Sequence, residues 1–191
     1  MTHVSIIGTG NMGQAISGIV TAGGNTVEVF NSSGPDTPVT GDVVVLAVPY
    51  PAVADIVAKR GHELAGKVVV DISNPLDFET FDSLTVPADS SAAAELAEAL
   101  PQSRVLKAFN TNFAATLASR TIGGLPTTVL VAGDDADAKA LLLGIVTAGG
   151  LRGLDAGSLR RARELEALGF LQLTNAVSEK ISWTGGFALA R

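Results

Sequence analysis

The feature that most constrains the fold of this chain is a glycine-rich turn near its N-terminus. Gly8, Gly10 and Gly13 follow the pattern G-x-G-x-x-G, after a strand-like run at residues 4–8 and before a helix-like segment at residues 11–22. A strand, this turn and a helix in succession are the context that a dinucleotide-binding fingerprint requires. Gly8 permits the tight turn, Gly10 lets the backbone approach a pyrophosphate, and Gly13 allows the helix to pack closely on the strand. A glycine turn that only packs is the alternative.

The residues expected to surround the dinucleotide come from this turn and from the ends of later predicted strands. The free N–H groups and the partial positive charge of a helix N-terminus favour phosphate binding. Ligands of open α/β sheets bind beyond the C-terminal ends of the strands, where this chain has the segments 47–50 and 73–76, each with a proline, and the amide-rich segment 109–112. The expected cofactor-binding residues are Gly8, Thr9, Gly10, Asn11, Met12, Gly13, Asn31, Ser32, Ser33, Ala47, Val48, Pro49, Tyr50, Ser73, Asn74 and Pro75.

The residues after the second predicted strand, at 26–30, favour NADP(H) over NAD. NAD-binding versions of this turn have an Asp or Glu there, about 20 residues further on, which accepts hydrogen bonds from the adenine ribose. This chain has Asn31, Ser32 and Ser33 instead. They leave no carboxylate to repel a 2′-phosphate, and they offer it neutral hydrogen-bond donors. A polar turn without any phosphate contact is the alternative.

Short β-rich runs alternate with helical segments in the first half of the chain, which is typical of a parallel α/β sheet. We therefore predict a Rossmann-type, doubly wound, mostly parallel sheet with a small C-terminal helical extension. Further strands are expected at residues 42–48, 67–73, 104–109, 127–133 and 151–154. Helices are expected at residues 51–64, 91–100 (capped by Asp89 or Ser90), 135–148 (capped by Asp134) and 158–180.

The connection between residues 31 and 42 is too short for the helix and strand that normally follow the second strand. We expect a truncated crossover, with residues 38–40 as a remnant of the edge strand. The dinucleotide-binding domain is placed at residues 1–155. Residues 156–191 are expected to form a C-terminal helix and tail that pack on this domain and are not an independent domain.

Composition argues against several classes of function. The 191 residues carry a net charge of −6 and no long block of Lys and Arg, so nucleic acid is not expected as a partner. No apolar stretch approaches the ~18 residues of a membrane span, and no signal peptide is expected. Cysteine is absent and no metal-ligand cluster occurs, so we expect neither disulfides nor a metal. A cytoplasmic protein is therefore expected.

Convincing acid–base residues are scarce. His3 and His62 are interpreted as solvated residues. Asp71 is expected to orient or pin a loop, and Lys107 to point to water, with an inward, catalytic Lys107 as the alternative. Oxidation of an alcohol needs a group that takes the hydroxyl proton, whereas hydride transfer between two redox cofactors needs mainly alignment and exclusion of water. The sequence favours the second chemistry.

Two segments near the C-terminus carry further hypotheses. The arginines of residues 160–163 are expected to pair with Glu164 and Glu166 on the surface, with binding of an anionic acceptor tail as the alternative. Residues 183–187 (WTGGF) place two glycines between aromatic side chains. Their backbone is expected to run close to other groups, either through simple packing or against a ligand or a neighbouring subunit.

Five motifs together make the chain resemble a known family. They are GTGNMGQAI, VVVLAVPYPAV, VVVDISNPL, VLKAFNTNFA and GLDAGSL, and the likeness extends to the RARELEALGF segment and the SWTGGFALA ending. In this order they resemble the F420-dependent NADP oxidoreductase family, and in particular its compact bacterial, dinucleotide-binding branch. Two departures are the lack of the arginines that namesakes place after the second strand, and the shortened crossover.

The resemblance implies a Rossmann domain with NADP(H) across residues 8–13, the 2′-phosphate near residues 31–33, and the nicotinamide near Pro49, Asn74 and Pro75. It also implies a homodimer. In the family's namesakes a deazaflavin, F420, stacks against the nicotinamide and exchanges hydride with it. The residues implied as lining of the hydride site are Asn74, Pro75, Leu76, Phe109, Asn110 and Thr111.

Three hypotheses of function remain. The first is an NADP(H)-dependent oxidoreductase whose hydride partner is an F420-like deazaflavin, a flavin or a small acceptor. The second is a non-catalytic NADP(H)-binding redox sensor; an open cavity beside the nicotinamide, large enough for a tricyclic ring, would favour the enzyme over it. The third is a β-hydroxyacid or imine dehydrogenase, which would need a large helical second domain with a catalytic lysine, and little beyond the last predicted helix is left for one.

Overall fold

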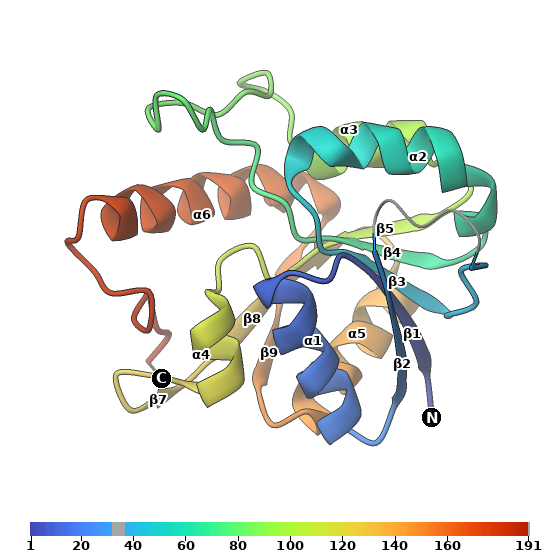
Figure 1. The fold of residues 1–191 in the computed structure, drawn as a ribbon, viewed down its shortest axis with the longest axis horizontal. Helices are drawn as coiled ribbons and strands as arrows, with labels where there is room; N and C mark the ends of the chain where they lie inside the picture. The colour runs from blue at the N-terminus through green and yellow to red at the C-terminus, as the bar shows by residue number, and fades with distance from the viewer. Residues whose placement is uncertain (32–36, 191) are drawn as a thin grey trace.

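A seven-stranded sheet runs through the centre of the computed structural model, which describes residues 1–31 and 37–190 (Figure 1). The strands lie in the order β2-β1-β3-β4-β5-β8-β9. Their bounds are β1 (His3–Ile7), β2 (Thr26–Phe30), β3 (Val43–Leu46), β4 (Val68–Asp71), β5 (Arg104–Lys107), β8 (Thr128–Gly133) and β9 (Arg152–Gly157). A separate two-stranded hairpin is formed by β6 (Thr121–Ile122) and β7 (Leu125–Pro126).

Helices connect the strands and cover both faces of the sheet. They are α1 (Asn11–Ala22), α2 (Tyr50–Leu64), α3 (Ala92–Ala99), α4 (Ala114–Ser119), α5 (Ala136–Ala148) and α6 (Ala162–Val177), with a 3-10 turn, η1 (Leu159–Arg161), before α6. From β2 to β5 all neighbouring strands are parallel, whereas β8 is antiparallel to β5, and β9 is parallel to β8. The predicted doubly wound, mostly parallel Rossmann-type sheet is therefore confirmed.

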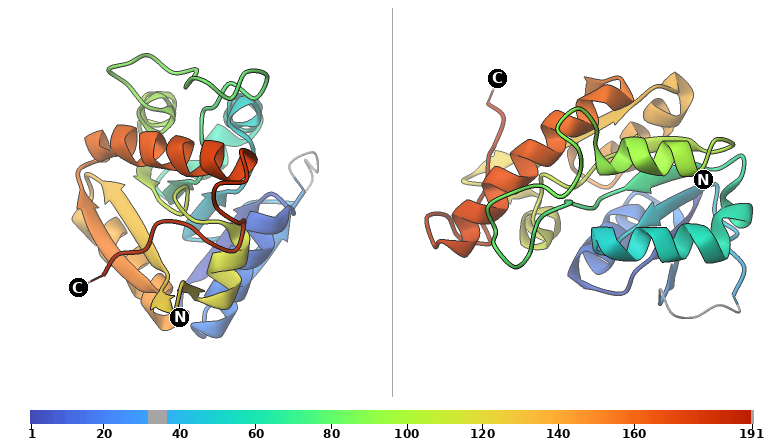
Figure 2. Two further views of the ribbon diagram at one scale, coloured as in Figure 1. Left: turned by 90° about the vertical axis from the view of Figure 1, so that its left-hand side faces the viewer. Right: turned by 90° about the horizontal axis from the view of Figure 1, so that it is seen from above.

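Alternate residues of the central strands point to opposite faces and fill two apolar layers. Val43 and Val45 of β3 pack with α1, α4 and α5 on one face, while Val44 and Leu46 pack with α2 and α3 on the other. Figure 2 shows these two layers of helices on either side of the sheet. Because strands of this kind are covered on both faces, they are almost wholly apolar. Helix α6 lies across the carboxyl ends of β4 and β5, near the loop of residues 72–91 (Figure 1).

Several predicted boundaries are wrong by one to a few residues, for local reasons. Helix α3 is capped by Ser91, whose Oγ accepts from the N–H of Ala94, and not by Asp89 or Ser90. Helix α5 is capped by Asp135, not Asp134. The predicted helix 158–180 divides into η1 and α6, and it ends early because Glu179 adopts a left-handed backbone with φ 58°.

The connection from β2 to β3 is short, as expected, but it holds no remnant of an edge strand at residues 38–40. There the N–H of Val39 donates to Glu63 at 2.7 Å, and the N–H of Thr40 donates to Glu28 at 3.1 Å. The backbone therefore bonds to side chains of neighbouring elements instead of to a strand. Within residues 1–31 and 37–190, no helix combines the length and apolar character needed to cross a bilayer.

Candidate functional site

The glycine turn lies at the point where the strand order reverses, between β1 and β3. The N–H of Gly8 donates to Phe30 at 2.8 Å, and the N–H of Ala47 donates to Ile7 at 2.8 Å, so the turn is held to both neighbouring strands. Gly8 has φ 129°, and a Cβ built on it would come within 2.1 Å of the Ala47 carbonyl oxygen. In open α/β sheets this switch point is the crevice in which ligands bind.

The three glycines of the motif differ in what demands them. A Cβ on Gly13 would lie 2.1 Å from the Gly8 carbonyl oxygen, so close packing of α1 on the turn excludes a side chain there. A Cβ on Gly10 would meet no protein atom within 4 Å, and the φ of Gly10 is an ordinary −71°. Close contacts within the protein therefore explain why residues 8 and 13 are glycine. They do not explain Gly10, whose Cβ position faces free space.

The first turn of α1 presents uncapped backbone donors to this space. The cap residue, Gly10, has no side chain that could accept from them. Thr9, Gly10 and Asn11 are exposed. The first N–H groups of a helix have no partner within the helix, so they can bind an anion that approaches the turn.

A cavity of about 400 Å³ opens beside this turn, at the carboxyl ends of β4 and β5. This volume is within the range of small-molecule sites. Its lining residues are Asn11, Met12, Ile72, Asn74, Phe109, Asn110, Asn112, Phe113, Ala114, Ala115, Leu173 and Trp183. The structure thus brings together Asn11, Met12, Asn74, Phe109 and Asn110, which the sequence places at the dinucleotide or hydride site. It adds the start of α4, Leu173 of α6 and Trp183.

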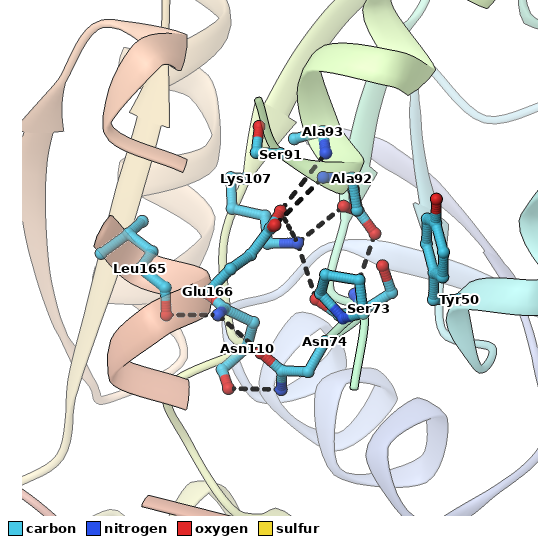
Figure 3. A network of polar contacts seen from close by, with 12 residues as sticks. Tyr50, Ser73, Asn74, Ser91, Ala92, Ala93, Lys107, Asn110, Leu165 and Glu166 are labelled. Atoms are coloured by element: carbon cyan, nitrogen blue, oxygen red, sulfur yellow. Dashed lines mark hydrogen bonds and ion pairs between the residues drawn. The ribbon is translucent and has the colours of Figure 1, made fainter. Parts of the chain in front are cut away.

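Two amide side chains join β4, β5 and α6 at the edge of this cavity (Figure 3). Asn110 Nδ2 donates to Asn74 Oδ1 at 3.0 Å and to the Leu165 carbonyl oxygen at 2.8 Å. In return, Asn74 Nδ2 donates to the Asn110 carbonyl oxygen at 3.0 Å. Gly169 of α6 lies over the pair, and a Cβ there would come within 2.4 Å of Asn74 Oδ1. The pair is therefore fixed by tight packing as well as by hydrogen bonds.

Two buried side-chain oxygens at the cavity have no partner among the described residues. They are Oδ1 of Asn110 and Oδ1 of Asn112, in residues that are 5% and 6% exposed. The amide nitrogen of Asn112 is occupied by the Thr128 carbonyl oxygen at 3.0 Å. A buried acceptor without a partner carries a free-energy cost, so such atoms mark a place where a ligand with N–H or O–H groups would be stabilised.

Phe109 adds a second sign of a functional position. It is 1% exposed, lines the cavity, and has a left-handed backbone with φ 62°. A bulky residue in this conformation is strained by about 1–3 kcal/mol, and such strain persists where the surrounding structure imposes it, often at active sites.

Lys107 is the clearest correction to the sequence-based predictions. Its side chain is fully buried and points inward, where its Nζ lies 2.7 Å from Asp71 Oδ2 and 2.8 Å from Glu166 Oε1 (Figure 3). It also donates to the Ser73 carbonyl oxygen at 2.6 Å. A buried ammonium is stable only when it is paired and hydrogen-bonded, and these three contacts satisfy it. Lys107 is not among the residues that line the cavity, which argues against the catalytic alternative too.

Asp71 pins the following loop, as the sequence predicts. Its Oδ1 accepts from the N–H of Ser73 at 2.8 Å while its Oδ2 binds Lys107. Ser73 is thereby held on both sides, through its N–H and its carbonyl group. Because Asn74 comes next in the chain, the ion pair fixes the backbone just before a cavity residue.

Glu166 completes this buried network and is not found by sequence reasoning. Its carboxylate accepts from the N–H groups of Ala92 at 3.0 Å and Ala93 at 3.3 Å, at the N-terminus of α3. Burial raises the pKa of Glu166, although Lys107 acts in the opposite direction. The expected surface pairing of Glu166 with arginines is wrong, whereas Arg161 does pair with Glu164 at 2.9 Å. The only sequence signal was a carboxylate on an otherwise apolar stretch of helix.

Other predicted site residues lie near the cavity without lining it. Pro49 is the N-cap of α2 and is exposed. Tyr50, the first residue of α2, donates to Glu95 of α3, and burial and that carboxylate raise the pKa of Tyr50 to about 12. Five further predicted site residues are buried, namely Val48, Ser73, Pro75, Leu76 and Thr111. Ser32 and Ser33 lie outside the described residues.

The predicted close approach at residues 183–187 is confirmed. Trp183 packs on Phe113 with ring centroids 4.9 Å apart. The N–H of Phe187 donates to Gln172 Oε1 at 3.0 Å, and a Cβ on Gly186 would come within 2.9 Å of the same oxygen. The tail therefore folds back along α6 and reaches the cavity.

Comparison with known proteins gives a consistent set of relatives. A family model described as NADP oxidoreductase coenzyme F420-dependent matches residues 38–75. An F420-dependent NADP reductase of Methanocaldococcus jannaschii is 29% identical over 166 residues, covering 85% of this chain and 74% of that protein. Metalloreductase STEAP3 of Rattus norvegicus is 32% identical over 180 residues, covering 86% of this chain and 36% of that protein. A solved structure from Arthrobacter sp. FB24, to which F420-dependent NADP reductase activity is attributed, matches with a TM-score of 0.84 and 24% identity over 100% of both chains.

Proposed function

Because this chain belongs to the family of coenzyme F420-dependent NADP oxidoreductases, we propose that it transfers hydride between NADP(H) and a second, flat redox ring. The single observation that carries the proposal is the free space around Gly10. Its missing side chain serves no contact within the protein, yet it leaves the backbone open beside the uncapped N-terminus of α1. A pyrophosphate is the group that such a cradle accepts.

The dinucleotide would lie along the crevice. The turn from Gly8 to Gly13 would hold the pyrophosphate, and Asn31, with Ser32 and Ser33, would face the 2′-phosphate. Pro49, Asn74 and Pro75 would border the nicotinamide, with Ala47, Val48, Tyr50 and Ser73 as the backbone that supports this border. No carboxylate stands at residues 31–33, directly after β2, which supports NADP(H) over NAD.

The chain's own contribution to the reaction is orientation and exclusion of water. When bound, the nicotinamide supplies or accepts the hydride. Met12, Ile72 and Phe109 give the cavity an apolar wall that keeps water from the reacting rings. The Asn74–Asn110 pair fixes the polar edge of the wall, and the two unpartnered amide oxygens offer acceptors to ring N–H groups. Lys107 takes no part in proton transfer because its donors are bound within the protein.

The cavity supports an enzyme rather than a sensor. A sensor needs only the dinucleotide crevice, whereas about 400 Å³ lies open next to it. This space suits an F420-like deazaflavin or a flavin as hydride partner, between the hydride-site residues Asn74, Phe109 and Asn110. The neighbouring Pro75, Leu76 and Thr111 would support them from behind. We also propose that the protein acts as a homodimer, which sedimentation can test directly.

The binding half of this proposal is tested with two matched glycine variants. Gly10→Val should weaken NADPH binding at least about a hundredfold, equivalent to ~2.7 kcal/mol, because it blocks approach to the pyrophosphate. Gly18→Val is the control, because Gly18 also lies in the N-terminal region, on α1, and has open space at its Cβ. Both are measured by calorimetric titration, with thermal unfolding as a check on the fold. Equal affinity of the two variants for NADPH would show that the pyrophosphate does not bind at this turn.

The catalytic half is tested by turnover with defined acceptors. NADPH is expected to bind more tightly than NADH, and NADPH oxidation is expected to depend on added F420 or FMN. If NADH binds at least as well, the interpretation of Asn31, Ser32 and Ser33 is wrong. If NADPH binds tightly and neither acceptor is reduced, the result favours the redox-sensor hypothesis over the oxidoreductase hypothesis.

A further inference from the structure

Among the described residues, Trp183 is the one exposed large hydrophobic side chain that lines the cavity. Its exposed fraction is 51%, and it is the only tryptophan in the chain. One part of its ring packs on Phe113, which also lines the cavity. A large, half-exposed aromatic side chain at the edge of a ligand-sized cavity is typical of a surface that a ligand covers.

A buried side chain of α6 holds the tail that carries this tryptophan. Gln172 is 2% exposed and spans the gap between the cavity rim and the tail. Its Nε2 donates to the Thr111 carbonyl oxygen at 3.1 Å, and its Oε1 accepts from the N–H of Phe187 at 3.0 Å. Further along, Arg152 Nη1 donates to the Leu189 carbonyl oxygen at 3.2 Å. The tail is thus held by hydrogen bonds at Phe187 and Leu189, after Gly186, and by the packing of Trp183 on Phe113 before it.

We infer that Trp183 is a specificity-determining residue that stacks on the second redox ring, and that Gln172 is the residue that positions it. The inference rests on the proposed function, because it names the surface that selects the hydride acceptor. It commits to a class of acceptor, namely a flat, conjugated ring system with N–H groups. Nothing in it concerns the dinucleotide crevice.

The shape and polarity of the cavity support this class. Phe109, Phe113 and Leu173 provide apolar surface, on which flat rings pack well. Oδ1 of Asn110 and Oδ1 of Asn112 are buried acceptors without a partner in the described part of the chain. A ring that carries N–H groups would satisfy these oxygens, while an aliphatic or purely acceptor-bearing molecule would leave them unpaired.

Trp183 differs from the other half-exposed aromatic side chain of the tail, Phe187, in its relation to the cavity. Phe187 lies on the same segment and is 46% exposed, close to the exposure of Trp183, but it does not line the cavity. Phe187→Leu is therefore a matched control for Trp183→Leu. Both variants remove a half-exposed aromatic ring from the tail, and only one of them touches the cavity.

The first measurement separates KM from kcat with FMN and F420 as acceptors. Trp183→Leu should raise the acceptor KM by about tenfold, the size expected for one lost stacked aromatic contact, with NADPH affinity unchanged. Trp183→Phe should restore most of the affinity because it keeps an aromatic face. Phe187→Leu should behave as the unchanged protein. Gln172→Leu should raise the acceptor KM as Trp183→Leu does, although Gln172 lies outside the cavity lining.

The second measurement does not need turnover. A flavin in contact with an indole loses its own fluorescence by electron transfer, so FMN bound to the unchanged protein should be dark. It should become fluorescent when bound to Trp183→Phe and stay dark when bound to Phe187→Leu. Binding itself is followed by equilibrium dialysis, so that brightness is compared at equal occupancy.

The outcomes separate this inference from the proposed function. If acceptors are reduced but Trp183→Leu matches Phe187→Leu in KM, the stacking role of Trp183 is wrong and the oxidoreductase assignment stands. If NADPH does not bind, the proposed function fails, and the fluorescence of bound FMN still decides the role of Trp183. If neither FMN nor F420 binds the unchanged protein, the inference is overturned.

Discussion

The glycine turn and the Lys107–Asp71–Glu166 network lie on the same edge of the sheet but are built in opposite ways. The turn is made of backbone, and its function depends on side chains being absent at Gly8, Gly10 and Gly13. The network consists of three charged side chains that are almost completely buried, drawn from β4, β5 and α6. One region leaves space for a ligand, and the other fills space to hold the backbone beside that ligand.

The glycine turn and the buried network should therefore respond differently to substitution. In the turn, the cost of a substitution depends on whether protein or free space surrounds the missing Cβ. In the network, removing Lys107 leaves two buried carboxylates without their cation, which is among the most destabilising changes a protein can undergo.

The largest effect is expected from Lys107→Met. The variant leaves Asp71 and Glu166 as uncompensated buried carboxylates, which should lower the free energy of unfolding by on the order of 3–5 kcal/mol. Chemical denaturation followed by circular dichroism measures the change. Lys139→Met is the control, because the pair of Lys139 with Asp155 is 2.9 Å long but Asp155 is half exposed. Such a pair contributes less than about 1 kcal/mol, so equal losses for both variants would contradict the role given to burial.

A smaller but clear effect is expected within the turn itself. Gly8→Ala introduces a Cβ against the Ala47 carbonyl oxygen at a backbone φ of 129°, which should destabilise the fold by on the order of 1–3 kcal/mol. Gly10→Ala should change stability by less than about 0.5 kcal/mol, since its Cβ meets free space. Thermal unfolding without nucleotide measures both. A destabilised Gly10→Ala would mean that the fold, and not a ligand, demands Gly10.

The smallest effect concerns pH, where two carboxylates should act with opposite signs. Burial raises the pKa of Glu166 above its ordinary value of 4.5, so the folded state holds its proton more tightly than the unfolded state. The stability lost by ionising Glu166 is therefore regained as the pH falls toward 4.5. Burial acts in the same direction on Glu28, but hydrogen bonds from Ser5 and Thr40 outweigh it and lower its pKa. Its contribution is present above 4.5 and is lost as the pH falls further.

The measurement is the free energy of unfolding from pH 7 to pH 3 for Glu166→Gln and Glu28→Gln. As the pH falls, the free energy of unfolding of Glu166→Gln should decrease relative to that of the unchanged protein, whereas that of Glu28→Gln should increase. Parallel curves for the two variants would show that burial does not dominate at Glu166.

The two regions also differ in how far the sequence predicts them. The strand, turn and helix around residues 4–22 are confirmed because each depends on residues a few positions apart. The mostly parallel direction of the sheet is confirmed too, since alternating β-rich and helical segments are typical of it. The reversed direction of β8 was not predicted, because no pattern within 127–133 distinguishes a parallel from an antiparallel strand.

The network was missed because its members are far apart in sequence. Lys107 and Asp71 are separated by 36 positions, and Glu166 and Ala92 by 74. An apolar strand that ends in a lysine is compatible with a solvated or a buried amine, and only the packing of α6 decides between them. Placement of Gln172 and Trp183 depends on the same helix, so the far wall of the cavity could not be predicted either.

The buried network has an evolutionary consequence. Loss of the lysine at position 107 would leave two carboxylates in the core without a counter-ion, so a substitution there should occur together with substitutions at positions 71 and 166 among related sequences. Exchange of the C-terminal helix between two relatives should succeed only when both carry an acid at the position of Glu166, or when residue 107 is exchanged with it. The last helix is in this sense inherited with the strand beneath it.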